Sequence, residues 1–161
     1  MVFGPLFLAS CKRSEKSMEP IIYAPSESVE KGLTDTEKHQ IAQEIRALMS
    51  SDSVIGIQKM DSSLVLKTTK LLHSMYQFSD FNALWLDAKN LEDAFFVIEE
   101  SAWDGFWPAD YHLEAIRELS AETNREHVDF KRLALRDILL SDAIITLARH
   151  LVEGKTDPVR F

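Results

Sequence analysis

The residue types that most often bind metals or act as catalysts are thinly spread in this sequence. No two of its five histidines lie three or four residues apart, the spacing that would place two zinc ligands on one face of a helix. The single cysteine, Cys11, has no histidine near it that could lower the pKa of its thiol. No glycine-rich phosphate loop or serine elbow is present. We therefore expect no metal site, no cofactor and no catalytic residue. The histidines are His39, His73, His112, His127 and His150.

Acidic residues occur in two adjacent pairs, Glu92-Asp93 and Glu99-Glu100. Neighbouring residues on a helix point about 100° apart. No apolar surroundings isolate these carboxyls in a way that would raise a pKa and suit them to acid–base chemistry. We expect them to form a solvent-exposed helix face.

The charge balance argues against nucleic acid as a partner. Lysine and arginine number 18 and aspartate and glutamate 26, so the net charge is −8. The only tight basic cluster, Lys12, Arg13 and Lys16, is interrupted by Glu15. A polyanion would repel such a chain. The hydrophobic share of 45% is enough for a packed core, yet no run approaches the roughly 20 apolar residues of a membrane-spanning helix.

The N-terminal residues suggest a lipid anchor. Residues 1–10 are mainly apolar, and Leu8-Ala9-Ser10-Cys11 matches the bacterial lipobox, whose cysteine receives lipid. Several acyl chains on one residue would anchor the protein stably to a membrane. No basic residue precedes the apolar run, so either translation starts upstream or the run is not a signal. We expect 1–10 to be a partial lipoprotein-type signal, 11–33 a flexible tether, and 34–161 a helical domain.

Helical periodicity dominates that domain. Thr34 and Glu37 have the spacing of a capping box for a helix to about Ser50. The apolar residues that follow recur with the period of one helix face. A second helix is expected to begin at Ser62 or Ser63. The apolar stripe of the first helix consists of Ile41, Ile45, Leu48 and Met49.

Three more helices follow. Asn90 is expected to cap one that Gly105 stops, and Pro108 to occupy the first turn of the next. The last runs from about His127 to Glu153, with apolar residues on nearly every face. The prediction is an all-α fold, a compact domain of about five helices around a long, buried C-terminal helix, preceded by a flexible N-terminal tail.

Four segments carry a resemblance to a known family. They are MYQFSDFNALW (75–85), DGFWPADYHL (104–113), LLSDA (139–143) and LVEGKTDP (151–158). In order and spacing they resemble the scaffold domain that precedes the catalytic domain in large bacterial L,D-transpeptidases. Each segment alone is a weak signal, but four in register are specific.

The resemblance implies a periplasmic, membrane-anchored lipoprotein in cell wall biogenesis, acting in peptidoglycan cross-linking as a fragment or a separately encoded domain. Its partners would be an L,D-transpeptidase catalytic domain, in cis or in trans, and peptidoglycan, with the membrane reached through Cys11. The catalytic domain of that family carries Ser-His-Gly-x-x-Cys, which this sequence lacks, so no catalytic residue carries over. The alternative is a stand-alone lipid-anchored module that recognises peptidoglycan or an envelope protein.

The residues that match the family's motifs are expected to be structural. The aromatic ones favour a place in the core, with a surface that stacks on sugars as the alternative. His112 is expected to cap a helix or to hydrogen-bond near the turn after Pro108. The motif residues are Tyr76, Trp85, Asp104, Gly105, Pro108, Asp110, Tyr111, His112, Asp142, Gly154, Asp157 and Pro158.

Overall fold

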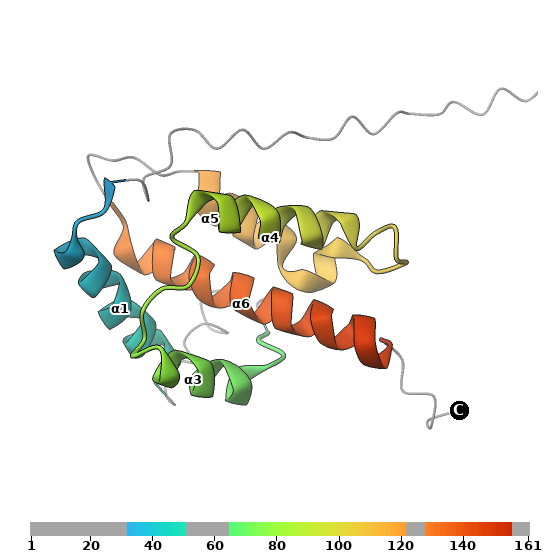
Figure 1. Ribbon diagram of the computed structural model, residues 1–161, viewed down its shortest axis with the longest axis horizontal. Helices are drawn as coiled ribbons and strands as arrows, with labels where there is room; N and C mark the ends of the chain where they lie inside the picture. Colours follow the sequence, from blue (N-terminus) through green and yellow to red (C-terminus); the bar gives the residue numbers. More distant parts are fainter. Residues whose placement is uncertain (1–31, 51–64, 122–127, 156–161) are drawn as a thin grey trace, which may run out of the picture.

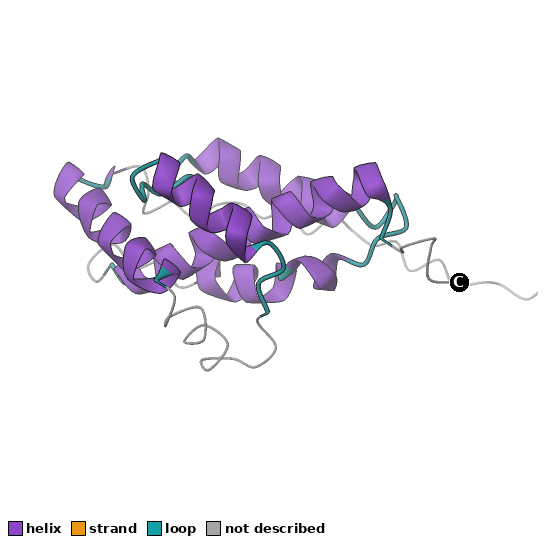
Figure 2. Cartoon of the chain, turned by 90° about the horizontal axis from the view of Figure 1, so that it is seen from below, coloured by secondary structure: helices purple, strands orange, loops and turns teal. Residues whose placement is uncertain are grey.

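The structure, a computed structural model, describes residues 32–50, 65–121 and 128–155. Within those ranges it contains five α-helices and one short 3-10 helix, joined by loops, and no strand (Figure 2). The predicted all-α fold is confirmed. Cys11, Asp157 and Pro158 lie outside the described residues, as do the expected signal segment and almost all of the tether. No described helix is both long and apolar enough to cross a membrane.

Helix α1 (Asp35–Met49) begins with the predicted capping box. Thr34 Oγ1 accepts a hydrogen bond from Glu37 N at 3.3 Å, and Glu37 Oε2 accepts one from Thr34 N at 2.6 Å. All four residues of its predicted apolar stripe are buried. Leu33, the last residue of the expected tether, also packs in the core.

Helix α3 (Thr69–Phe78) begins later than predicted. Residues 65–68 are described and are not helical, so the expected start at Ser62 or Ser63 is wrong for this helix. The cause is a long-range contact, since the backbone N–H groups of Lys67 and Thr68 donate to the carboxylate of Asp142.

Helix α4 (Ala88–Glu100) is capped by Asp87 and not, as predicted, by Asn90. Asp87 Oδ1 accepts from Asn90 N at 2.9 Å, which places Asn90 inside the first turn. The regular helix ends before Gly105, and turns follow. Gly105, at φ +83°, donates its N–H to Ala102 O while Phe106 N donates to Ser101 O. This pair of bonds around a left-handed glycine is a Schellman arrangement, so Gly105 terminates the turns after α4.

Two short helices come next. The 3-10 helix η2 (Pro108–Tyr111) has proline in its first turn, as predicted. His112 separates it from α5 (Leu113–Ala121) and adopts a left-handed conformation with φ +56°.

Helix α6 (Phe130–Glu153) forms the centre of the domain. It is capped by Asp129, two residues after the predicted start at His127, and it ends at Gly154 as predicted. In Figure 1 it runs between α1 and α3 on one side and α4 and α5 on the other. Every residue from Leu133 to Ala143 is buried, so the prediction of a long, buried C-terminal helix is confirmed.

Candidate functional site

The middle of α6 carries several polar side chains that are removed from solvent, among them two carboxyls and a serine hydroxyl. Asp137, Ser141 and Asp142 are exposed by only 1%, 2% and 0%. A buried carboxylate is unfavourable unless donors surround it, so each must find partners within the protein. Most of those partners come from segments that carry the family resemblance, while Lys67 and Thr68 lie outside them, and we call the three side chains the polar centre of α6.

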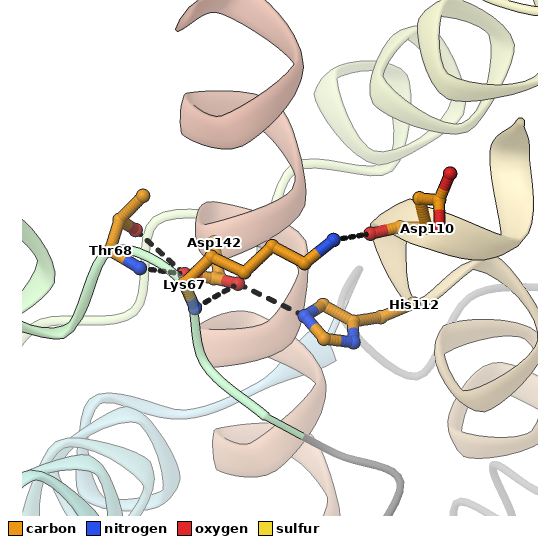
Figure 3. Close-up of polar contacts among 5 residues, drawn as sticks. All are labelled: Lys67, Thr68, Asp110, His112 and Asp142. Carbon is orange, nitrogen blue, oxygen red and sulfur yellow. Dashed lines mark hydrogen bonds and ion pairs between the residues drawn. The ribbon is translucent and has the colours of Figure 1, made fainter. Parts of the chain in front are cut away.

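Asp142 joins α6 to two distant segments (Figure 3). Its Oδ1 accepts hydrogen bonds from Thr68 N at 2.8 Å and Thr68 Oγ1 at 2.7 Å, and both of its oxygens lie 3.1 Å from Lys67 N. Its Oδ2 lies 3.0 Å from His112 Nε2. A carboxylate can only accept, so Nε2 of His112 carries the proton. The residues that lead into α3 and into α5 are thereby held on α6.

The hydrogen bonds keep Asp142 ionised. Burial by itself would raise the pKa of this carboxyl, but the donors from His112, Thr68 and Lys67 outweigh burial and lower the pKa below its ordinary value. The ammonium group of Lys67 points away from the carboxylate and donates to Asp110 O at 2.5 Å (Figure 3). The carboxylate of Asp142 is therefore stabilised by neutral hydrogen-bond donors and by the His112 ring.

Asp137, about one turn earlier in α6, likewise accepts hydrogen bonds from distant segments. Its Oδ2 accepts from Trp85 N at 2.8 Å and from Leu84 N at 3.0 Å, and its Oδ1 accepts from Tyr76 Oη at 2.6 Å. Burial raises the pKa of Asp137, although the hydrogen bonds from Tyr76, Trp85 and Leu84 oppose that rise. Burial, followed by the nearby carboxylate, also raises the pKa of Tyr76, which keeps its proton.

Ser141 completes a directed chain of hydrogen bonds. Trp85 Nε1 donates to Ser141 Oγ at 2.8 Å, and Ser141 Oγ lies 2.9 Å from Tyr76 Oη. Because the phenol donates to Asp137, Ser141 must donate to Tyr76. The order is Trp85 to Ser141 to Tyr76 to Asp137, in which each bond polarises the next. This chain links α3, the segment before α4 and α6.

The polar centre of α6 holds distant segments together, and its polar groups are already used in internal hydrogen bonds. The two carboxylates and the serine hydroxyl are buried and already hydrogen-bonded, so none is placed to touch a reacting molecule. Among the described residues, no three His, Cys, Asp or Glu side chains are grouped so that they could hold a metal ion.

A second cluster surrounds the end of α6. The ring of Phe106 stacks on His150 with centroids 6.1 Å apart, and Tyr111 Oη lies 3.0 Å from His150 Nδ1. Burial and then the charges of Lys67, Arg149 and Lys155 lower the pKa of His150. The ring of His150 therefore favours the neutral form and packs on its aromatic neighbours.

The remaining motif residues fall into several environments. Asp110 pairs with Lys155 just beyond Gly154 and so ties η2 to the end of α6. Asp104 lies exposed in the turn after α4. Tyr76 and Tyr111 are fully buried, as the core interpretation expects.

Not every motif aromatic is in the core. Trp85 and Phe106 are half-buried and pack against it. Trp107, by contrast, is 69% exposed.

Sequence reasoning missed Asp137 and the role of Ser141. The available signal was a polar residue inside a helix that is apolar on nearly every face, because such a residue must be buried with a partner. The partners themselves lie about fifty to sixty residues away, and periodicity cannot identify them.

One of three comparisons with known proteins found a match. A family model described as "Scaffold domain" matches residues 70–161, a span that contains all four resembling segments and the whole of α6. Searches of curated proteins and of solved structures return no match. Since the family model covers more than half of the 161 residues, this chain belongs to the scaffold-domain family, as its resemblance to the scaffold domain of L,D-transpeptidases predicted.

Proposed function

We propose that this chain is the non-catalytic scaffold domain of a cell-envelope L,D-transpeptidase and takes part in peptidoglycan cross-linking. It would do so as part of a longer protein or as a separately encoded domain. The observation that carries the proposal is the family match over 70–161, which spans Asp137, Ser141 and Asp142 together with their partners Tyr76, Trp85 and His112.

The proposed role is to hold a catalytic domain in place. The polar side chains of the polar centre of α6 are occupied by internal hydrogen bonds, which favours a mechanical role for them. The chemistry would then come from a domain with the Ser-His-Gly-x-x-Cys motif, acting in cis or in trans. A rigid frame suits that task because misplacing a reacting group by about 1 Å can slow a reaction about a hundredfold.

Reconstitution would test this proposal. The purified chain is mixed with an L,D-transpeptidase catalytic domain from the same organism and with tetrapeptide muropeptides, and cross-linked products are followed by mass spectrometry. We expect no product from the chain alone, direct binding to the catalytic domain, and faster cross-linking when both are present. Product formation by the chain alone would contradict the proposal, and so would the absence of both binding and stimulation. Asp142→Asn, which loosens the frame, should reduce the stimulation.

The proposed location is the periplasm, on a membrane reached through lipid at Cys11. Its support is the lipobox Leu8-Ala9-Ser10-Cys11. Metabolic labelling with a fatty acid in a bacterial host should mark the full-length gene product, and Cys11→Ser should abolish the label. Labelling that survives in Cys11→Ser would exclude this anchor.

A second candidate is a stand-alone module that binds peptidoglycan or an envelope protein. The exposed indole of Trp107, within a family-motif segment, favours it because exposed aromatic rings mark binding surfaces. Co-sedimentation with purified sacculi, lost in Trp107→Ala, together with no effect on a catalytic domain, would favour this candidate over the first.

A further inference from the structure

Large apolar side chains are exposed on the face of α4 that points away from the core. Phe96 is 61% exposed and Val97 47% exposed, and Trp103 in the turn that follows is 81% exposed. Large side chains grouped in this way on a soluble domain usually mark a contact surface. We define the outer face of α4 as Glu92, Phe96, Val97, Glu100, Trp103 and Asp104.

Acidic and apolar side chains alternate along this face. Glu92, Phe96, Glu100 and Trp103 follow one another at intervals of three or four residues, which places them in one stripe along the helix. The turn after α4 continues the winding, since Trp103 N donates to Glu100 O at 2.9 Å. The stripe therefore continues past the end of α4 as far as Trp103.

No ion pair joins the carboxylates of the stripe to a described neighbour, although the charge of Lys89 acts on Glu92 from three residues away. In the ranges that the structure describes, no salt bridge reaches Glu92, Glu100 or Asp104. The nearby pairs involve other carboxylates, because Lys89 binds Asp93 and Arg117 binds Glu99. At the end where Glu100 and Asp104 lie, the outer face of α4 thus presents carboxylates outside any ion pair of the described residues, beside exposed apolar rings.

We propose that the outer face of α4 docks a cationic amphipathic segment of a partner protein. Aliphatic side chains of that segment would cover Phe96 and Val97. A lysine or arginine would stack on the indole of Trp103 and pair with the carboxylates of Glu100 and Asp104. Charge complementarity of this kind fixes orientation and speeds association.

The negative charge of this face also argues against three other ligands: a second copy of this chain, an anionic bilayer and a neutral sugar. A second copy of this chain would bring a further net charge of −8 to an acidic surface. An anionic bilayer surface would be repelled for the same reason. A neutral sugar could stack on Trp103 but would leave the carboxylates without a cationic partner.

Calorimetric titration of the full chain tests the proposal. The probe is a synthetic helical peptide with arginine and leucine on one face. We expect binding that weakens as the salt concentration rises. Trp103→Ala and Glu100→Lys should each reduce the affinity about tenfold, because a stacked indole and a central charge are typical energetic anchors.

Matched controls lie on the opposite side of α6 (Figure 1). Phe78→Ala removes an aromatic ring that is 96% exposed on α3, and Glu44→Lys reverses a charge on α1. Both variants should bind as the wild type does, and circular dichroism should show that all four variants fold. The same peptide with glutamate in place of arginine should not bind.

Three outcomes would overturn the proposal. One is equal binding by all four variants, another is binding of the glutamate peptide, and the third is no binding of the arginine peptide. Binding of chitin oligosaccharides that is lost in Trp103→Ala, with no peptide binding, would assign the surface to a glycan. None of these results bears on the proposed envelope function, which is tested by cross-linking in the presence of a catalytic domain.

Discussion

His112 Nε2 donates a hydrogen bond to Asp142 Oδ2 at 3.0 Å, across thirty residues of sequence. The imidazole comes from the segment after Pro108 and the carboxylate from the middle of α6, so one bond joins two of the segments that resemble the scaffold family. His112 reaches this position with a left-handed backbone, which few residues adopt without cost. The fold therefore holds His112 in an unfavourable backbone conformation so that its ring reaches Asp142.

Replacing Asp142 by asparagine should destabilise the domain by about 3 kcal/mol. The carboxylate accepts from two backbone N–H groups, a hydroxyl and an imidazole, whereas an amide offers one acceptor oxygen and turns an NH2 group toward a donor. Urea unfolding followed by far-ultraviolet circular dichroism measures the loss.

The matched control is Asp80→Asn. Asp80 makes an exposed ion pair with Arg46 and has a positive φ, a conformation that asparagine tolerates. The urea midpoint of this variant should stay close to that of the wild type. Similar losses in the two variants would mean that the carboxylate of Asp142 is not an anchor.

Local signals in the sequence predicted most of the helices. The capping box at Thr34, the proline that opens η2 and the terminating Gly154 act through neighbours a few residues away, so their effect is readable from spacing. The start of α3 was predicted too early because residues 65–68, although compatible with a helix, are held in another conformation by Asp142.

The polar centre of α6 could be predicted only in part. Asp142 was identified through a motif, but its partners were not, since they are set by how three segments fold back on one helix. Asp137 lay outside every motif. The side chain of His112 bonds to α6, while its backbone C=O accepts from Ile116 N at 3.0 Å near the turn where a cap or hydrogen bond was expected.

The chain of bonds through Ser141 should behave as one unit. Tyr76→Phe and Ser141→Ala should each destabilise the fold by about 1.5 kcal/mol, because each leaves buried groups without a partner. The double variant should lose about 1 kcal/mol less than the sum of the two. Urea unfolding of the four proteins gives this coupling energy. Strict additivity would show that the two hydroxyls act independently.

Gly105→Ala should cost about 1 kcal/mol through the backbone alone. Gly105 has φ +83°, and a Cβ built there meets no atom within 4 Å, so the penalty is conformational and not steric. Gly105→Asn should cost about half as much, because asparagine enters the left-handed region more readily. Thermal unfolding compares the variants, and equal losses for alanine and asparagine would contradict a conformational cause.

Acid should weaken the domain through His150. Burial and then the charges of Lys67, Arg149 and Lys155 lower its pKa in the folded state, while the unfolded chain has an ordinary value of about 6.5. The unfolded state therefore binds more protons, and stability that is present above about pH 6.5 is lost as the pH falls toward the folded pKa.

The variant His150→Gln isolates this contribution, because glutamine does not titrate. Its free energy of unfolding should change less than that of the wild type between about pH 7 and pH 5. Urea titrations at several pH values in this window give both curves, and the remaining titrating groups contribute equally to each. Curves that run parallel across the window would mean that His150 is protonated as easily in the folded domain as in the unfolded chain. In that case its packing against Phe106 and Tyr111 would not disfavour its charge.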